Sequence, residues 1–256
     1  MSFSSTSKLR TAVVIPARYA STRLPGKPLA DILGRPMIQH VHERAKQVRS
    51  AQVVLVATDD ERVMRAVQGF GGTAMLTSPD HASGTDRLVE VMQSVQADLY
   101  VNLQGDEPLV RPSDIDMLIE GMASTPSAAV GTLCHAITAE EAADPNIVKV
   151  VRTHDGSALY FSRSLIPYPR DAKDLRDGAP GVVYQKHVGV YAYRRDVLMR
   201  YSSLPASMLE DTEKLEQLRL LSAGIAIKVW QVEPTGPGVD TPEGLAMVRT
   251  LMSGQP

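Results

Sequence analysis

A group of positive charges follows an apolar run near the start of the chain. Within PARYASTRLPGKPL, residues 16–29, Arg18, Arg23 and Lys27 stand on a backbone stiffened by prolines and turned at Gly26. Arginine offers a planar fork for phosphate oxygens, and lysine offers a compact point charge. The three cations could therefore hold a polyphosphate. They could also be scattered surface cations, and the stretch is not a Walker loop because the Gly-x4-Gly-Lys-Ser/Thr pattern is missing.

Two acidic segments supply candidate ligands for a divalent cation. VNLQGDEPLV, residues 101–110, ends an apolar run at Asp106, and TGPGVDTPEGL, residues 235–245, leads through glycines and prolines to Asp240. Mg²⁺ prefers hard oxygen ligands and is commonly held by one or two carboxylates together with phosphate oxygens. Paired carboxylates beside a triphosphate would hold the metal and neutralise charge on the reacting phosphate. Taken singly, each acid could instead cap a turn or a helix.

A third segment could contact a nucleoside. DHASGTDR, residues 80–87, places Ser83, Gly84 and Thr85 at an expected helix start. Backbone N–H groups and hydroxyls are available at such a start and can bind the base or the sugar of a nucleotide. Plain capping of the helix accounts for the same residues, so the segment by itself leaves both interpretations open.

The histidines and the cysteine give little information by themselves. In the strand-like stretch KHVGVYAY, a period of two places His187 and Tyr191 on one face. A buried histidine with satisfied hydrogen bonds is the commoner case. His40 and His42 do not share a helix face, and no zinc site is evident. Cys134 is the single cysteine, which excludes a disulfide framework, and we expect it in the core.

The elements that must position these groups alternate along the first half of the chain. Strand-like stretches cover 11–17, 51–58, 73–76 and 97–108, and helix-like stretches cover 36–48, 59–72, 83–95 and 111–122. This order predicts an α/β fold with a mostly parallel, mixed central sheet and helices on both faces. In such sheets, ligands bind at the carboxyl ends of the strands, where the cationic stretch and Asp106 are expected.

After about residue 125 the pattern changes to strand-like stretches joined by short loops. LEDTEKLEQLRLLSAG, residues 209–224, predicts one amphipathic helix with Leu215 and Leu218 on its apolar face. IAIKVWQVE, residues 225–233, predicts a late strand. Glu216 and Gln217 lie off the apolar face of the predicted helix, where they are free to contact a ligand.

The composition limits the class of protein. The chain has 256 residues, of which 43% are hydrophobic and 22% charged, with a net charge of −2. This is a globular profile without the general basic field that nucleic-acid binding requires. No segment approaches the roughly 20 apolar residues needed to cross a bilayer, and the first apolar stretch is too short for a signal peptide. We therefore expect a reduced, cytoplasmic protein that binds neither nucleic acid nor membrane.

The motifs in combination resemble a known family. PARYASTRLPGKPL, HASGTDRL, NLQGDEPL, NIVKVV, ALYFSRSLIPY, KHVGVYAYR, LEQLRLL and GPGVDTPEGL occur in this order between residues 16 and 245. Together they are similar to the 3-deoxy-D-manno-octulosonate cytidylyltransferases. The resemblance implies a nucleotide-diphospho-sugar-transferase-like fold and a Mg²⁺-dependent reaction of CTP with 3-deoxy-D-manno-octulosonate (KDO). The products would be CMP-KDO, used for lipopolysaccharide, and pyrophosphate.

The resemblance also implies roles for matched positions. The catalytic residues would be Lys27, Arg18, Asp106 and Asp240, with Asp106 and Asp240 as the metal ligands. CTP would be bound by Arg18, Ser21, Arg23, Lys27, Ser83, Gly84 and Thr85. KDO would be bound by Gln104, Arg163, His187, Tyr191, Glu216 and Gln217.

The resemblance further implies one nucleotidyltransferase domain over 1–256. Residues 1–125 would form its nucleotide-binding part, and 126–256 its sugar-binding and dimerisation part. A strand-rich dimerisation insertion, with the exposed face of the strands around 155–193, would join two copies into a homodimer.

Three other functions stay open on the sequence alone. A cytidylyltransferase for another sugar acid, such as sialic acid, would use the same phosphate loop, although KHVGVYAY and LEQLR favour KDO. A hexose-1-phosphate nucleotidyltransferase would need further cations for its sugar phosphate. A non-catalytic nucleotide-binding protein could share the fold, although the two candidate metal carboxylates favour catalysis.

Overall fold

The computed structural model describes residues 9–21, 23–81, 83–171 and 181–254. The prediction about a signal peptide falls partly on residues 1–8, which lie outside the described residues. Among the described residues, no helix has both the length and the apolar character needed to cross a membrane.

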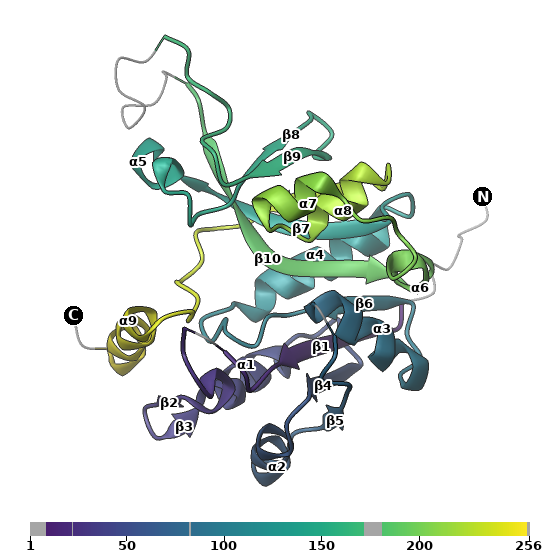
Figure 1. Cartoon of the computed structure of the whole chain (residues 1–256), viewed down its shortest axis with the longest axis vertical. Helices are drawn as coiled ribbons and strands as arrows, with labels where there is room; N and C mark the ends of the chain where they lie inside the picture. The colour runs from purple at the N-terminus through teal and green to yellow at the C-terminus, as the bar shows by residue number, and fades with distance from the viewer. Residues whose placement is uncertain (1–8, 22, 82, 172–180, 255–256) are drawn as a thin grey trace, which may run out of the picture.

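A nine-stranded mixed sheet forms the centre of the molecule (Figure 1). Its strands are β1 (Thr11–Ala17), β4 (Val53–Thr58), β5 (Ala74–Leu76), β6 (Leu99–Asn102), β7 (Val130–Ile137), β8 (Lys149–Arg152), β9 (Ala158–Ser162), β10 (Tyr184–Arg194) and β11 (Ile227–Gln231). The main order is β11-β7-β10-β6-β1-β4-β5, and β8 and β9 branch from β10. β1 runs parallel to β4 and β6, whereas β10 runs antiparallel to β6 and β7. The predicted mixed α/β sheet is confirmed.

Helices cover both faces of this sheet. They are α1 (Met37–Ala45), α2 (Glu61–Gly69), α3 (Gly84–Ser94), α4 (Pro112–Ser124), α5 (Ala139–Ala143), α6 (Arg195–Tyr201), α7 (Met208–Glu213), α8 (Gln217–Ser222) and α9 (Pro242–Ser253). A 3-10 turn, η1 (Lys27–Leu29), and a hairpin of β2 (Asp31–Ile32) and β3 (Arg35–Pro36) follow β1.

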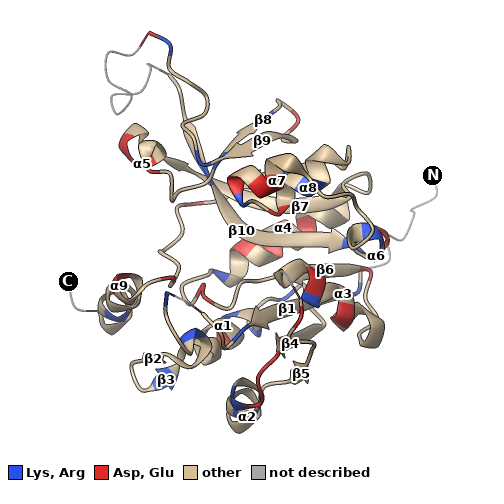
Figure 2. Ribbon diagram, in the orientation of Figure 1, with Lys and Arg blue, Asp and Glu red and all other residues tan. Residues whose placement is uncertain are grey.

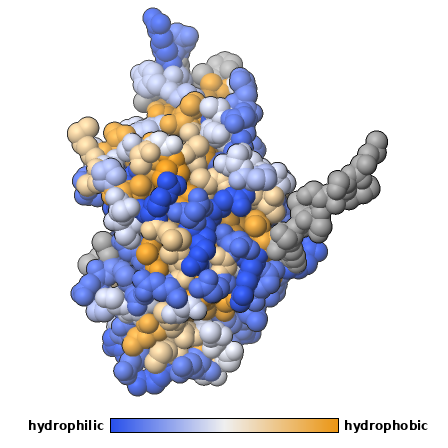
Figure 3. Space-filling model, turned by 90° about the vertical axis from the view of Figure 1, so that its right-hand side faces the viewer, coloured by the Kyte–Doolittle hydropathy of each residue, from blue (hydrophilic) through white to orange (hydrophobic). Residues whose placement is uncertain are grey.

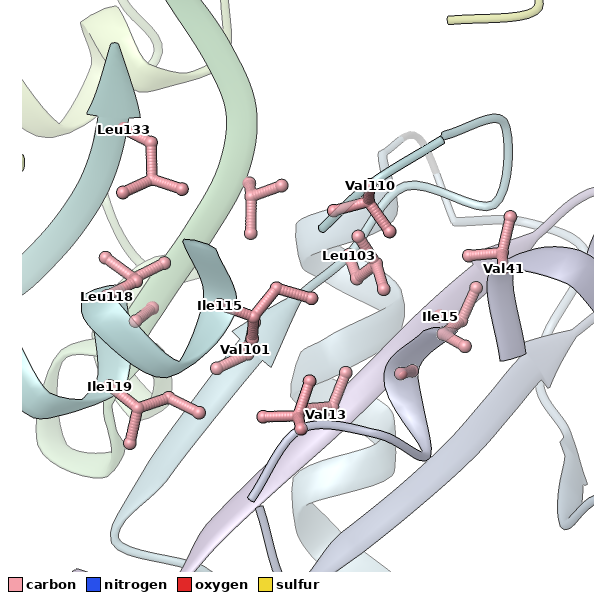
Figure 4. Close-up of a cluster of buried hydrophobic side chains, with 14 of the residues drawn as sticks. Val13, Ile15, Val41, Val101, Leu103, Val110, Ile115, Leu118, Ile119 and Leu133 are labelled. Carbon is pink, nitrogen blue, oxygen red and sulfur yellow. The ribbon is translucent and has the colours of Figure 1, made fainter. Parts of the chain in front are cut away.

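The alternation of side chains along β1 produces two apolar cores. Val13 and Ile15 point to one face, where they pack with residues of α1, α2 and α4 (Figure 4). Ala12 and Val14 point to the other face, where they pack with residues of α3, α6 and α8. Because β1 is buried on both faces, its sequence is apolar from Ala12 to Ala17 and shows no polar alternation. Cys134 is buried in the second core, as expected.

The single helix predicted for residues 209–224 is wrong. The segment forms α7 and α8, and Lys214 between them adopts a left-handed conformation with φ 54° and ψ 48°. The apolar face predicted from the leucines is still present, since Leu215 and Leu218 are both buried in the second core despite the break. At the break, the Glu213 carboxylate accepts hydrogen bonds from Ser162 Oγ and the Arg163 N–H. These tertiary contacts are invisible to the local period.

The C-terminal helix lies away from the central sheet. An extended segment after β11 leads to α9, which packs beside the β2–β3 hairpin (Figure 1). A third, smaller apolar cluster holds it there and includes Ile32, Met37, Leu245 and Val248. Thr241 caps α9 by accepting a hydrogen bond from the Gly244 N–H, so the cap is the residue after Asp240 and not the acid itself.

Candidate active site

The cationic stretch leaves the carboxyl end of β1 and forms one wall of a cavity of about 340 Å³. The rest of the cavity is lined by the turn after β6, the start of α3 and the segment before α9. Eight of the predicted site residues line it: Arg18, Ser21, Arg23, Lys27, Gly84, Gln104, Asp106 and Asp240. Segments from the start, the middle and the end of the chain therefore meet at one place, and the parallel pairing of β1 with β6 accounts for the first two of them.

Lys27 lies between the two candidate metal ligands. Its Nζ is 2.5 Å from Asp106 Oδ2 and 3.0 Å from Asp240 Oδ1. The two carboxylate oxygens are therefore no further apart than the sum of these distances, 5.5 Å. Arg23 adds a second cation, with Nη2 3.3 Å from Asp240 Oδ2. In Figure 2 the acidic and basic segments lie side by side where the loop after β1 approaches the start of α9.

The two acids stabilise the charge of Lys27, and Lys27 with Arg23 stabilises the charge of Asp240. Burial alone would lower the pKa of Lys27, but Asp106 and Asp240 outweigh it and raise that pKa, so the amine is charged. Burial raises the pKa of Asp106 in spite of Lys27. Burial also acts to raise the pKa of Asp240, but Lys27 and Arg23 outweigh it and hold that pKa below its usual value. Asp240 is thus a carboxylate at neutral pH.

The turn that carries Asp106 is held close to β1. A Cβ atom at Gly105 would lie 2.8 Å from the Pro16 carbonyl oxygen, so only glycine fits here. Glu107, which the sequence analysis did not select, stands beside Asp106. Burial, together with the Asp106 charge, raises the pKa of Glu107 to about 8. Its place in the QGDEP turn, next to Asp106, was the signal that could have indicated it.

The start of α3 is capped as the plainer interpretation predicted. The Ser83 hydroxyl accepts a hydrogen bond from the Asp86 N–H at 3.1 Å and donates one to the Asp86 carboxylate. Thr85 Oγ1 donates to Glu216 Oε2 at 3.1 Å, which joins α3 to the start of α8. Gly84 lines the cavity. A role of this turn in nucleotide binding stays a prediction.

Three predicted KDO residues, His187, Tyr191 and Gln217, are buried and do not line the cavity. The ring of His187 is 5.2 Å from that of Tyr191, and its Nε2 is 3.0 Å from Thr132 Oγ1. Burial, with help from the Lys186 charge, lowers the pKa of His187 to about 3, so the imidazole is neutral. Tyr191 Oη and Gln217 Nε2 are buried without a hydrogen-bond partner among the described residues. Such unpaired polar atoms are costly and are commonly satisfied by a ligand or water.

Arg163 makes contacts outside the cavity. Its Nε donates to the Glu213 carbonyl at 2.8 Å, and its Nη1 donates to the Pro145 carbonyl at 3.3 Å. The guanidinium thus ties the end of α7 to the segment after α5. The assignment of Arg163 to the KDO pocket rests on the family resemblance alone.

Sequence reasoning also missed a buried arginine behind the phosphate loop. Arg87 is fully buried on α3 and donates to Thr77 Oγ1 and to Asp59 Oδ2. Asp59 in turn accepts the Tyr19 N–H at 3.4 Å and so fixes the loop beside Arg18. The helical spacing could have indicated that Arg87 is buried, because it lies four positions before the buried Val91 on the same face of α3.

Comparison with known proteins identifies the family. The sequence model of the family described as Cytidylyltransferase matches residues 12–227. A relative from Escherichia coli named 3-deoxy-manno-octulosonate cytidylyltransferase is 61% identical over 244 residues, which cover 95% of this chain and 96% of that protein. The chain belongs to the 3-deoxy-manno-octulosonate cytidylyltransferase family. As a member of this family it is a nucleotidyltransferase, which excludes a purely nucleotide-binding role.

Further relatives and solved structures extend the family comparison. A protein of the same name from Geobacter sulfurreducens is 49% identical over 94% of this chain and 98% of that protein. A solved CMP:2-keto-3-deoxy-manno-octonic acid synthetase in complex with CTP matches with a TM-score of 0.91 and 60% identity, over 96% of this chain and 99% of that one. A putative glucose-1-phosphate thymidylyltransferase from Bacillus anthracis, 19% identical with a TM-score of 0.63 over 94% of each chain, shares the fold. The predicted nucleotide-diphospho-sugar-transferase-like fold is thus confirmed.

Proposed function

We propose that the protein transfers the cytidylyl group of CTP to KDO and releases pyrophosphate, in the synthesis of CMP-KDO for lipopolysaccharide. The observation that carries the proposal is the meeting of Lys27, Asp106 and Asp240 in one cavity at the end of β1. The E. coli relative of 61% identity bears the name of this reaction, which supports KDO over another sugar acid as the acceptor.

The proposed chemistry is an in-line displacement at phosphorus. The anomeric hydroxyl of KDO attacks the α-phosphorus of CTP, and pyrophosphate leaves from the opposite side. The protein contributes positioning and charge stabilisation, not a covalent intermediate. Arg18, Arg23 and Lys27 bind the phosphates and stabilise the charge that develops on pyrophosphate. Arg18 suits this role because its Nη2 is buried and lacks a partner among the described residues.

Asp106 and Asp240 fit a Mg²⁺ ion. They offer hard oxygens within 5.5 Å of each other, and the Lys27 ammonium shows that a positive charge is accommodated between them. No cluster of three or more His, Cys, Asp or Glu side chains that could hold a metal occurs in the described part of the chain, so phosphate oxygens and water would complete the coordination. Mg²⁺ bound there would neutralise charge on the phosphates and lower the pKa of the attacking hydroxyl.

On the nucleoside and sugar side, we assign the other polar residues from the family resemblance, and of these Ser21, Gly84 and Gln104 also line the cavity. Ser21 and the Ser83–Thr85 turn would contact CTP, and Gln104 would face the acceptor from the cavity wall. His187, Tyr191, Glu216 and Gln217 would contact KDO, with His187 as a neutral hydrogen-bonding group because burial, together with the Lys186 charge, keeps its pKa low. Arg163 belongs to this set only by the family resemblance.

A pyrophosphate-release assay tests the proposed reaction. With CTP and Mg²⁺, we expect rapid release in the presence of KDO and little release with sialic acid or with hexose 1-phosphates. The identity of the product is checked by mass spectrometry, which should show CMP-KDO. Equal release with sialic acid and KDO would contradict the proposed acceptor, and release with glucose 1-phosphate would point to the other nucleotidyltransferases of this fold.

We also propose that the chain works as one domain, with residues 1–125 binding the nucleotide and 126–256 forming the sugar-binding and dimerisation part. The central sheet supports this division, because β1, β4, β5 and β6 come from the first part and β7 to β11 from the second. A reducing, cytoplasmic setting, where CTP is available, agrees with the free and buried Cys134.

The proposed dimer surface gives a prediction for the apolar face around residues 155–193. Leu159 of β9 is 60% exposed and Val183 is 62% exposed. Figure 3 shows several apolar patches on the half of the molecule that contains β8, β9 and α7. We expect Leu159→Glu combined with Val183→Glu to turn a dimer into a monomer in sedimentation-velocity measurements, because a buried carboxylate at an interface is costly.

Met247→Glu is the matched control for this experiment. Met247 is also exposed and apolar, but it lies on α9, away from the proposed surface. The control should remain dimeric. A wild-type monomer, or a dimer that survives the Leu159 and Val183 substitutions, would contradict the assigned surface.

A further inference from the structure

Asp240 reaches the cavity on a connector without regular secondary structure. The connector runs from the end of β11 at Gln231 to the start of α9 at Pro242. β11 lies at one edge of the sheet, with β7, β10 and β6 between it and β1. A carboxylate on such a segment needs other contacts to hold it opposite Lys27 and Asp106.

Arg111 supplies two of these contacts. Its Nη1 donates to the Pro234 carbonyl at 2.8 Å, and its Nη2 donates to the Glu233 carbonyl. The Nε of the same guanidinium donates to Asp114 Oδ2 at 2.9 Å, which fixes the direction of the fork. A planar guanidinium can hold two successive carbonyls and a carboxylate at once, which a lysine cannot do.

The rest of the connector is fitted against the turn that carries Asp106. The Val239 N–H donates to the Asp106 carbonyl at 2.9 Å. A Cβ atom at Gly236 would lie 2.6 Å from a methyl carbon of Leu109, and one at Gly238 would lie 3.2 Å from Glu107 Oε1. The glycines therefore allow the connector to approach more closely than any other residue would.

We propose that Arg111 is a positioning residue that sets the place of Asp240 relative to Asp106. Arg111 holds the first part of the connector, and the Gly236 approach and the Val239 hydrogen bond bring the second part onto the Asp106 turn. The two acids thus share one rigid frame, although they lie far apart in the sequence. Arg111 lines no part of the cavity and acts through the backbone. This inference rests on the proposed metal role of the two acids.

The test measures the Mg²⁺ dependence of turnover for Arg111→Met and Gly236→Ala at saturating CTP and KDO. We expect the apparent Mg²⁺ constant to rise by about 10-fold to 100-fold, as is typical when a residue that orients a metal ligand is lost. The KM for CTP should change by less than about threefold, because the phosphate-binding cations keep their places. Arg111→Lys, which can reach one carbonyl, should fall between Arg111→Met and the wild type.

A second measurement does not depend on turnover. Binding of Mn²⁺ to the protein with CTP and without KDO, followed by electron paramagnetic resonance, should weaken in Arg111→Met and Gly236→Ala by a similar factor. Asp240→Asn serves as the positive control for lost metal binding. If the wild type binds Mn²⁺ and CTP but does not react with KDO, the proposed function fails while the positioning role can still be measured.

Matched controls separate positioning from general damage. Arg65→Met removes an arginine that pairs with Glu61 on the exposed side of α2. Gly69→Ala adds a methyl group where nothing lies within 4 Å. Both controls should keep the wild-type metal affinity. Wild-type Mn²⁺ affinity and Mg²⁺ dependence in folded Arg111→Met or Gly236→Ala would overturn the proposal, even if their melting temperatures fell.

Discussion

Asp106→Asn should lower kcat by about 10²-fold to 10³-fold and leave CTP binding much less affected. An amide keeps the shape of the side chain but removes the negative charge that would hold Mg²⁺ against the reacting phosphate, and loss of such a stabilising group typically costs this much in rate. CTP keeps its contacts with the cations of the phosphate loop. Steady-state kinetics with CTP and KDO, together with calorimetric titration of CTP, measure the two effects separately.

Two substitutions serve as comparisons for Asp106→Asn. Asp240→Asn should have a similar effect, since both acids contact Lys27 and line the same cavity. Asp155→Asn removes a carboxylate that pairs with Lys228 on the surface, and it should leave kcat unchanged. Near-normal turnover in Asp106→Asn or Asp240→Asn would remove that residue from the metal site.

Lys27→Ala should reduce kcat/KM for CTP by about 10-fold to 100-fold. Charge-assisted hydrogen bonds of this kind are worth about 1.5–3 kcal/mol. Because Lys27 would contact the phosphates in the bound state and stabilise the leaving pyrophosphate, both the rate and the CTP affinity should fall. In the free protein, the same substitution leaves Asp106 and Asp240 close together without the cation between them. The Mg²⁺ concentration that gives half of the maximal rate should therefore differ from that of the wild type.

The controls for Lys27→Ala test charge separately from shape. Lys27→Arg keeps the charge and should recover part of the activity, although its planar fork does not reproduce a compact ammonium. Lys228→Ala removes an ion pair with Asp155 on the surface and should have little effect on CTP kinetics. An unchanged kcat/KM for CTP in Lys27→Ala would exclude Lys27 from the phosphate-binding group.

The features that depend on neighbouring residues could be predicted from the sequence. The apolar run at 11–17 coincides with β1, and Ser83 caps α3 at the helix start that the sequence predicts. Capping and strand periodicity are local, because the groups involved lie within one turn or one strand of each other. The cationic stretch and the acids were identified for the same reason, as residue types at the ends of recognisable elements.

Local periodicity failed where tertiary contacts decided the structure. The leucine pattern over 209–224 predicted one helix, but the Glu213 contacts with β9 accompany a break at Lys214. Arg87 is buried behind the phosphate loop because Asp59, on another strand end, faces it. The sequence patterns did not indicate a role for Arg111. Its partners are the backbone carbonyls of residues 233 and 234, which every residue has, so the residue types reveal nothing about this contact.

Which charged side chains come into contact depends on the three-dimensional fold. Lys27 and Asp106 are 79 positions apart in the chain, and Lys27 and Asp240 are 213 apart. No local rule connects such distant residues. They meet because β1 and β6 are parallel neighbours whose carboxyl ends share one edge, and because the connector after β11 is held against that edge by Arg111 and by glycines that allow close contact. Strand pairing and backbone packing, which depend on the whole chain, convert three separate motifs into one site.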